Sequence, residues 1–332
     1  MENRKGVWYN GFAVAKCRNA LGVMKIKDFP AKPQRVNQKE SLMEITRLHS
    51  ECIKCLLNKF LKNQPTDRDE EYNLFYLQTL LRILSEAKLT DSAPIIMNRI
   101  EKALGTRGDF SKEKLYFNCL LIKKQDYIRD KIAKASEPLK LAVKFAQLGN
   151  YIDFGALDSV SEEVLESRLN SADDMAIDQV EFENLKKDLE NAKRLVYLTD
   201  NCGEVVLDKL LIEELKAQYP ALQIDVLVRG FPVLNDATME DAEQIGLTEV
   251  ANVTSNGSSI AGTVLEDISD EAKAIIDSAD VIIAKGQANF ETLRYCKKNI
   301  YYLFLCKCKT FAERFKVEPG TGMMINDRRM EE

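Results

Sequence analysis

Five short apolar segments in the second half of the chain are each followed by polar residues that could do chemistry. The segments are 195–198, 224–228, 250–254, 281–284 and 300–305, and their length and composition predict buried strands. In an open parallel sheet, ligands bind beyond the carboxyl ends of the strands, so the polar residues are expected to share one edge. They are Thr199 to Glu204, Arg229 with Asn235 and Asp236, Ser255 to Ser258, Lys285 to Asn289, and Lys307.

Three of these residues form an oxygen-rich set suited to a hard divalent cation. Asp200 and Asn201 follow the first segment, and Asp236 follows the second. Carboxylate and amide oxygens favour ions such as Mg²⁺ or Mn²⁺ over structural zinc. Because His49 is the only histidine, zinc sites built on three histidines are excluded. We therefore predict that Asp200, Asn201 and Asp236 bind a divalent metal ion.

Positive charge and glycine-containing turns surround the predicted metal ligands. Arg229 and Lys285 supply two basic side chains, and turns at Gly203, Gly257 and Gly286 can point backbone N–H groups at an anion. A cation, basic side chains and free amides together describe a phosphate site. The other residues that we predict to bind substrate are Glu204, Gly286, Asn289 and Lys307.

This set of residue types indicates phosphoryl transfer. The metal would polarise a phosphoryl oxygen, while Arg229 and Lys285 neutralise charge on the equatorial oxygens. Asp200 is the candidate nucleophile or base in addition to being a metal ligand, and the sequence leaves open a covalent aspartyl-phosphate or direct attack by water. The residues predicted to be catalytic are Asp200, Asn201, Asp236 and Lys285.

Each of these residues also has a purely structural interpretation. An aspartate at a strand end, such as Asp200, can simply cap the next helix. Asn235 and Asp236 can form an Asx turn, and Lys285 with Gly286 can form a surface turn. Their occurrence together at successive strand ends favours the functional interpretation.

The elements that must position these residues alternate between strands and helices. Amphipathic helices are predicted at 205–218 and 270–279, between consecutive strands. Such repeats require right-handed crossovers and hence a parallel sheet with helices on both faces. We predict an α/β fold in which residues 193–332 form a three-layer α/β/α sandwich with a mostly parallel, Rossmann-like sheet.

The first half of the chain is predicted to be helical. Residues 42–192 show helical periodicity and a connector, with breaks near 64–67 and 104–109, and are assigned to a helical N-terminal domain. Residues 1–41 lack periodicity and contain two prolines, so a poorly ordered extension is predicted there. The expected architecture is therefore a helical N-terminal domain followed by an α/β/α sandwich.

Composition excludes several classes of partner. The chain has 332 residues with 47 Lys and Arg against 52 Asp and Glu, a net charge of -5 that gives no basic track for nucleic acid. No apolar run approaches the roughly 20 residues of a membrane helix, so no membrane association is expected. Eight cysteines without a signal peptide predict reduced thiols and a cytoplasmic location. Nothing in the sequence predicts an oligomeric state.

A second group of possible metal ligands lies near the start of the helical region. His49, Cys52 and Cys55 are spaced three residues apart and could lie along one side of a helix. Cysteine is also a common buried residue, so a structural role is an equal alternative to a second metal site.

Several longer motifs resemble one family of enzymes. The stretches 198–208 (LTDNCGEVVLD), 228–238 (VRGFPVLNDAT) and 284–292 (AKGQANFET) resemble the damage-control phosphatases, first catalogued as domain of unknown function 89. Cys52 to Cys55 and the stretch 148–154 (LGNYIDF) resemble the prokaryotic subfamily that carries a Cys-x-x-Cys motif. The resemblance extends from about residue 43 to residue 327.

The resemblance implies a helical domain on an α/β/α sandwich, a metal held by Asp200, Asn201 and Asp236, and phosphate contacts from Lys285. It implies a phosphatase using Mg, Mn, Co or Ni that acts on small damaged or surplus phosphometabolites such as sugar phosphates. Two departures are present. Ala288 replaces the usual glycine of Lys-Gly-Gln-Gly-Asn, which adds a Cβ to the anion turn, and the first lysine of the Lys-Ala-Lys-Cys pattern is Leu305.

Other classes of protein built on a parallel sheet fit this sequence less well. A dinucleotide-binding oxidoreductase needs a Gly-x-Gly-x-x-Gly turn, whereas Gly203 stands alone after the first strand, and no P-loop motif is present. Haloacid dehalogenase-type phosphatases have a second aspartate where this chain has Cys202. The alternative that remains is a catalytically weak module that binds a phosphometabolite or a metal.

Overall fold

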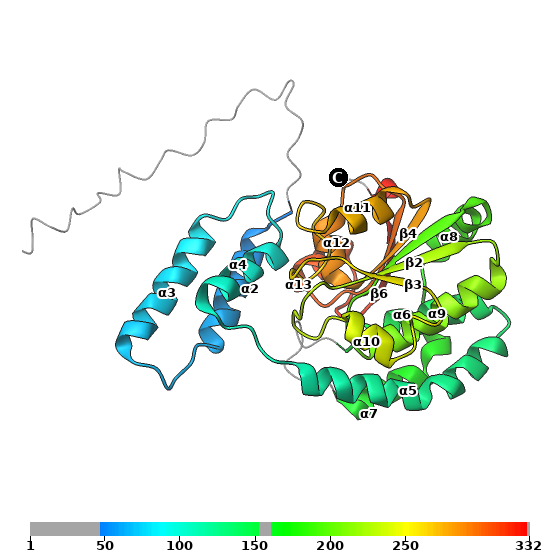
Figure 1. Cartoon of the computed structure of the whole chain (residues 1–332), viewed down its shortest axis with the longest axis horizontal. Coiled ribbons are helices and arrows are strands. Elements are labelled where there is room, and N and C mark those ends of the chain that lie inside the picture. The colour runs from blue at the N-terminus through cyan, green and yellow to red at the C-terminus, as the bar shows by residue number, and fades with distance from the viewer. Residues whose placement is uncertain (1–46, 153–160, 331–332) are drawn as a thin grey trace, which may run out of the picture. The chain divides into compact units, whose positions relative to one another are not determined.

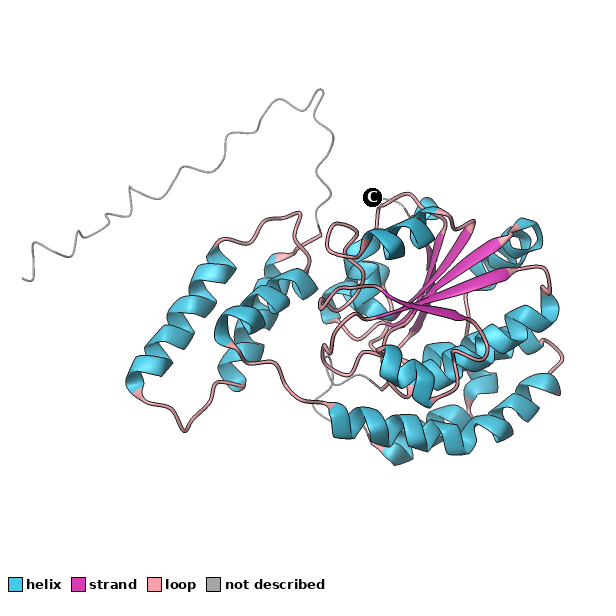
Figure 2. Cartoon of the chain, viewed as in Figure 1, coloured by secondary structure: helices cyan, strands magenta, loops and turns pink. Residues whose placement is uncertain are grey.

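A twisted six-stranded sheet forms the centre of the computed structural model, which describes residues 47–152 and 161–330 (Figure 2). The strand order is β3-β2-β1-β4-β5-β6; the first five strands are parallel and β6 is antiparallel to β5. The order reverses where β1 meets β4, and such a switch point opens a crevice at the carboxyl ends. The strands are β1 Arg194–Leu198, β2 Gln223–Val228, β3 Asn252–Ser255, β4 Val281–Lys285, β5 Ile300–Leu305 and β6 Gly322–Asn326.

Helices cover both faces of this sheet (Figure 1). Successive strand residues alternate between two cores: Leu195 and Tyr197 pack with α5, α6 and α9, whereas Val196 and Leu198 pack with α11, α12 and α13. Both faces are therefore buried, which explains the nearly continuous apolar strands. The helices of the two layers are α5 Ser111–Ala133, α6 Pro138–Gly149, α9 Glu204–Gln218, α11 Asp270–Asp277, α12 Gly286–Leu293 and α13 Lys309–Phe315.

Three N-terminal helices have an apolar cluster of their own. These helices are α2 Ser50–Lys62, α3 Glu70–Ser85 and α4 Ala93–Leu104, and we call their core the α2–α4 cluster. The cluster also contains Val233 from the loop after β2 and Ala261 from the loop after β3. The three helices therefore lie beside the loops at the carboxyl edge of the sheet.

Shorter elements complete the described chain, and local sequence signals explain where helices begin. Ser161 and Asp178 accept hydrogen bonds from backbone N–H groups in the first turns of α7 and α8. Gly105 ends α4 in the left-handed conformation with φ of 64°. The remaining elements are α7 Glu162–Asn170, α8 Gln179–Asn191, α10 Met239–Gln244 and the 3₁₀ turns Ala172–Asp174 and Asp327–Arg329.

The predicted α/β fold with a mostly parallel sheet is confirmed. All five predicted strands are present with ends shifted by at most two residues, and the helices predicted at 205–218 and 270–279 are α9 and α11. The antiparallel strand β6 was not predicted, because its five residues carry no alternation or turn signal that distinguishes them from a loop.

The predicted domains can be compared with the cores to which the helices contribute. Residues 1–41, predicted as an extension, lie outside the described residues. Within the predicted helical domain, α5, α6 and α8 contribute side chains to the same core as the sheet, whereas α2, α3 and α4 do not. Across the described ranges, no helix combines the length and apolarity needed to cross a membrane.

Candidate metal and phosphate site

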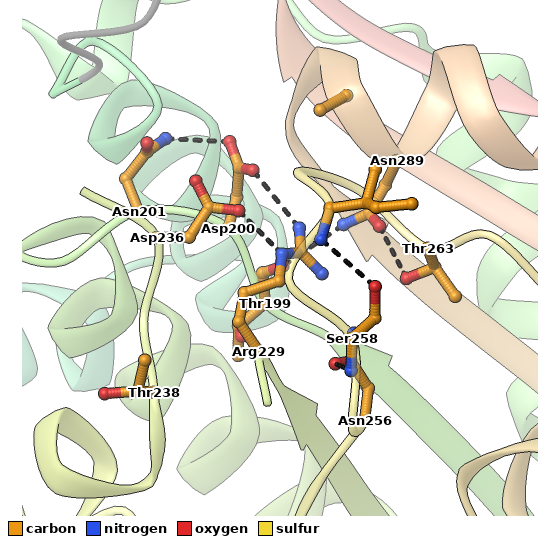
Figure 3. A network of polar contacts seen from close by, with 12 residues as sticks. Thr199, Asp200, Asn201, Arg229, Asp236, Thr238, Asn256, Ser258, Thr263 and Asn289 are labelled. Atoms are coloured by element: carbon orange, nitrogen blue, oxygen red, sulfur yellow. Dashed lines mark hydrogen bonds and ion pairs between the residues drawn. The ribbon is translucent and has the colours of Figure 1, made fainter. Parts of the chain in front are cut away.

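Polar side chains from two strand ends meet at the carboxyl edge of the sheet (Figure 3). Asp200 and Asn201 follow β1, while Arg229 and Asp236 follow β2. A backbone bridge between Asn201 and Asp236 joins the two segments, and the Ala237 amide donates a 2.7 Å hydrogen bond to the Asp200 carbonyl. All four residues are at most 5% exposed. The sheet therefore brings together the predicted metal ligands and one predicted basic residue.

The Arg229 guanidinium lies between the two carboxylates. Its Nε donates to Asp236 Oδ2 at 2.6 Å, and its Nη2 lies 3.6 Å from Asp200 Oδ1. Nη2 is buried and has no hydrogen-bond partner among the described residues. A buried guanidinium nitrogen without a partner is a strong donor for an anionic oxygen. The structure therefore places Arg229 between two of the predicted metal ligands, and its contact with phosphate stays a prediction.

Two amides orient the carboxylate of Asp200. Asn201 Nδ2 donates to Asp200 Oδ2 at 2.7 Å, and Asn150 Nδ2 donates to the same oxygen at 3.0 Å. Asn150 follows the last residue of α6, far from the strand ends in sequence, and the residue-by-residue prediction of the site did not include it. The stretch 148–154 that carries the family resemblance was the signal that could have identified it.

Lys285 has a different environment from the one predicted. Its side chain is fully buried, and its ammonium donates to Glu204 Oε1 at 2.5 Å, Asp208 Oδ1 at 2.7 Å and the Ala146 carbonyl at 2.9 Å. An ammonium has three hydrogens, so these contacts use all of its donors. In this arrangement Lys285 cannot also bind phosphate, and the same contacts make Glu204 an ion-pair partner rather than a substrate contact.

Burial and neighbouring charges set the ionisation of this cluster. Burial raises the pKa of Asp208 from 3.8 to about 7, with Glu204 adding to the increase and Lys285 opposing it. Burial disfavours the charged form of Lys285, but the carboxylates of Asp208 and Glu204 outweigh it and raise its pKa to about 12. Asp208 Oδ2 has no hydrogen-bond partner among the described residues.

Asp208 is expected to make stability depend on pH. A carboxyl group with a higher pKa in the native than in the unfolded state binds more protons when folded, so its stabilising contribution is lost as pH rises between the two values. For Asp208 this interval extends from 3.8 to about 7. Urea unfolding of the wild type should therefore show a free energy of unfolding that declines as the pH rises between these values. In Asp208→Asn this decline should be smaller. An equal decline in both proteins would contradict the contribution of Asp208.

Gly286 allows the start of α12 to approach Asp200. Its φ is 78°, and a Cβ built there would lie 1.9 Å from Asp200 Oδ2. Because N–H groups in the first turn of a helix lack intrahelical partners, this close approach puts potential anion donors beside the carboxylate. Gly286 therefore lies beside Asp200, and its contact with phosphate stays a prediction.

Replacing Gly286 by alanine is expected to lower kcat/KM by about 100-fold or more, because displacing a reacting group by about 1 Å costs that much. Gly105→Ala is the matched control: Gly105 has φ of 64° and no atom within 4 Å of the built Cβ. The control should cost about 1 kcal/mol of stability and leave activity unchanged. We measure kcat/KM and the melting temperature of both variants. Equal kcat/KM values would show that contact between position 286 and Asp200 has no effect on activity.

The other predicted anion-binding amides are already engaged. The Gly203 N–H donates to Asn118 Oδ1 at 2.7 Å, and the Gly257 N–H donates to the Ser255 hydroxyl at 3.2 Å. Asn289 is likewise structural: its amide donates to the carbonyls of Thr199 and Lys285, at 3.1 and 2.6 Å. These residues shape the loops around the site and do not present free donors to a phosphate.

Two further sequence features lie at the edge of the site. Lys307 follows β5, two residues beyond its last residue, and is partly buried. Ala288, the departure from the family pattern, packs against the α2–α4 cluster, so its methyl group is accommodated between α12 and these helices. The extra Cβ therefore contributes apolar contact with the helical region.

His49, Cys52 and Cys55 do not form a metal site in the structure. His49 precedes α2, Cys52 is partly buried and Cys55 is exposed on that helix. No group of three or more His, Cys, Asp or Glu side chains in residues 47–152 and 161–330 is arranged to hold a metal ion. Asp200 and Asp236 with the amide oxygen of Asn201 form a different kind of set, with two carboxylates.

Comparison with known proteins identifies the family of this chain. A family model described as the damage-control phosphatase ARMT1-like domain matches residues 48–323. A damage-control phosphatase of Pyrococcus horikoshii is 32% identical over 295 residues, covering 85% of this chain and 99% of the relative. A damage-control phosphatase of Archaeoglobus fulgidus is 30% identical over 280 residues, covering 81% and 95%.

A solved structure extends the similarity to three dimensions. The crystal structure of a DUF89 family protein from Pyrococcus horikoshii matches with a TM-score of 0.69 at 30% identity, covering 84% of this chain and 99% of that one. The resemblance noted in the sequence is therefore confirmed, whereas the Cys-x-x-Cys subfamily stays a prediction. Sequence, fold and family model agree that this chain belongs to the damage-control phosphatase family.

Proposed function

We propose that this chain is a metal-dependent phosphatase that hydrolyses phosphate monoesters of small phosphometabolites. The observation that carries this proposal is the pair of buried carboxylates, Asp200 and Asp236, on either side of the Arg229 guanidinium. This arrangement combines oxygen ligands for a cation with a donor for an anion. Relatives that are named damage-control phosphatases support the reaction class. Within this class, we propose damaged or surplus metabolites such as sugar phosphates as substrates.

The charge of the site suits a divalent cation. Four buried carboxyl groups, of Asp200, Glu204, Asp208 and Asp236, are accompanied by two buried cations, Arg229 and Lys285. Uncompensated charge is costly in a protein interior, so the surplus of carboxylates favours binding of a cation. Asp200, Asn201 and Asp236 would hold it through hard oxygen ligands, as Mg, Mn, Co or Ni.

The residues around the metal ligands have separate roles in this proposal. When bound, a divalent ion would polarise a phosphoryl oxygen and stabilise charge in the transition state. Arg229 uses its Nη2, which has no hydrogen-bond partner among the described residues, to bind an equatorial phosphoryl oxygen. Asp200 acts as nucleophile or base, and the first turn of α12 contributes backbone N–H groups. The α2–α4 helices, which contact the loops after β2 and β3, shape the choice of substrate in the cytoplasm.

Phosphate release from p-nitrophenyl phosphate and a panel of sugar phosphates tests the proposal. The purified protein is stripped with EDTA and then assayed with Mg, Mn, Co or Ni, with circular dichroism to verify folding. We expect turnover that requires metal and that is fastest on a sugar phosphate. Absence of turnover with every metal, from folded protein, would instead favour a module that binds a phosphometabolite or metal without hydrolysis.

A further inference from the structure

Asn150 connects three parts of the fold that meet below the site. It directly follows α6, is fully buried and belongs to neither of the strand ends that supply the metal ligands. Its Nδ2 donates to Asp200 Oδ2 and to Glu204 Oε2, each at 3.0 Å, and its Oδ1 accepts from the Leu305 N–H at 3.0 Å. Both amide hydrogens and the amide oxygen therefore have partners, in the segment after β1, in α9 and in β5.

We infer that Asn150 is a positioning residue for Asp200, which holds one carboxylate oxygen so that the other is directed towards Arg229. This inference rests on the proposed function. Oδ2 of Asp200 accepts from two amides, of Asn150 and Asn201, while Oδ1 lies 3.6 Å from Arg229 Nη2. The two oxygens are thereby distinguished, and rotation of the carboxylate would break both amide contacts.

The amides also separate two carboxylates of like charge. Asn150 and Asn201 each donate to both Asp200 Oδ2 and Glu204 Oε2, at distances between 2.7 and 3.0 Å. The other oxygen of Glu204, Oε1, accepts a hydrogen bond from Lys285 Nζ at 2.5 Å. Because a carboxylate held by an ion pair cannot move away from its neighbour, the bridging donors stabilise an arrangement that would otherwise be repulsive.

The backbone around Asn150 is fitted to this contact. A Cβ built on Gly149 would lie 3.1 Å from the Cα of Glu204 and 3.1 Å from the side chain of Leu207. Glycine at this position therefore lets the end of α6 lie directly against the start of α9, which brings the Asn150 amide within hydrogen-bonding distance of Asp200. The placement of Asn150 is thus fixed by close backbone packing as well as by its three partners.

An isosteric pair of variants tests the inference. Asn150→Asp replaces the donor by an oxygen facing two carboxylates, and Gln147→Glu makes the same change at a buried amide in the last turn of α6. Gln147 donates to the Met323 carbonyl at 2.8 Å and contacts no residue of the site through that bond. Both variants are compared with wild type by kcat and KM on the best substrate, by calorimetric titration with Mn²⁺ and by thermal melts.

Asn150→Asp is expected to lower kcat by about 10- to 100-fold and to change Mn²⁺ affinity by a similar factor, the range seen for residues that orient metal ligands. Gln147→Glu should lower the melting temperature while leaving kcat and Mn²⁺ affinity within about twofold of wild type. Equal kinetic losses in the two variants would overturn the positioning role, because burial of an extra carboxyl group would then explain both.

The same measurements distinguish failure of the proposed phosphatase function from failure of the positioning role of Asn150. A wild-type protein that binds Mn²⁺ but hydrolyses nothing contradicts the phosphatase proposal, while the Mn²⁺ affinities of the variants still decide the role of Asn150. If the wild type does not bind Mn²⁺, crystal structures of wild type and Asn150→Ala decide it. Rotation of the Asp200 carboxylate in Asn150→Ala supports the inference, and an unchanged Asp200 overturns it.

Discussion

Lys285→Met is expected to lower the free energy of unfolding by about 3–5 kcal/mol, the usual cost of removing one partner from a buried ion pair. The ammonium of Lys285 lies between Glu204 and Asp208, and all three side chains are fully buried. Removing it leaves two carboxyl groups facing each other without a cation. Urea unfolding of wild type and variant at pH 7 measures the loss.

A compensated variant separates charge from packing. Lys285→Met combined with Glu204→Gln and Asp208→Asn removes both carboxyl groups that the ammonium balances, so a large part of the lost stability should return. Replacement of a complete buried ion cluster is often neutral, whereas its partial removal is not. A single Lys285→Met variant that is as stable as wild type but binds phosphate poorly would contradict the structural role and restore the one predicted from the sequence.

Asp236→Asn is expected to lower kcat/KM by about 1,000-fold, the upper range for losing one essential electrostatic contact in an active site. The substitution removes a metal ligand of the proposed site and the carboxylate that holds Arg229 through the 2.6 Å contact with its Nε. Phosphate release with the preferred metal measures the effect. The loss should persist at saturating metal, because Arg229 has also lost its charged partner.

Asp225→Asn is the matched control for Asp236→Asn. Asp225 is 7% exposed and pairs with Arg194 at 2.9 Å, so it too is a buried aspartate held by an arginine. It lies within β2 and pairs with the first residue of β1, away from the carboxyl edge. Asp225→Asn should leave kcat/KM within about twofold of wild type. Similar kinetic losses in the two variants would mean that stability, and not the site, explains the effect.

Local sequence alone predicted much of the sheet and its edge. Parallel strands are buried on both faces, so each appears as a continuous apolar run, and five of the six were identified in this way. Because parallel strands end at one edge, Asp200, Asn201, Arg229 and Asp236 could be grouped before any coordinates were known. Strand β6 pairs antiparallel with β5 at the end of the sheet, and only tertiary contacts reveal that its five residues form a strand.

Which side chains face a ligand was decided by the tertiary structure. Lys285 and Arg229 are both basic residues at strand ends, and sequence gave no means to distinguish them. In the fold, Lys285 is surrounded by Glu204, Asp208 and the Ala146 carbonyl. Arg229 instead keeps a buried nitrogen that has no hydrogen-bond partner among the described residues. The difference arises because α6 and α9 supply acceptors on one face of β4, and their positions depend on packing between distant segments.

Asn150 is a residue of the site that local sequence did not predict and that the tertiary structure revealed. Fifty residues separate it from Asp200, yet their side chains are in direct contact because α6 packs against α9 at the end of the sheet. The sequence by itself determined the strand pattern, the polar residues at the strand ends and the family, since these depend on local composition and motif order. The tertiary structure decided which of those residues support the fold and which are left to bind a ligand, because hydrogen-bond partners come from segments far apart in the chain.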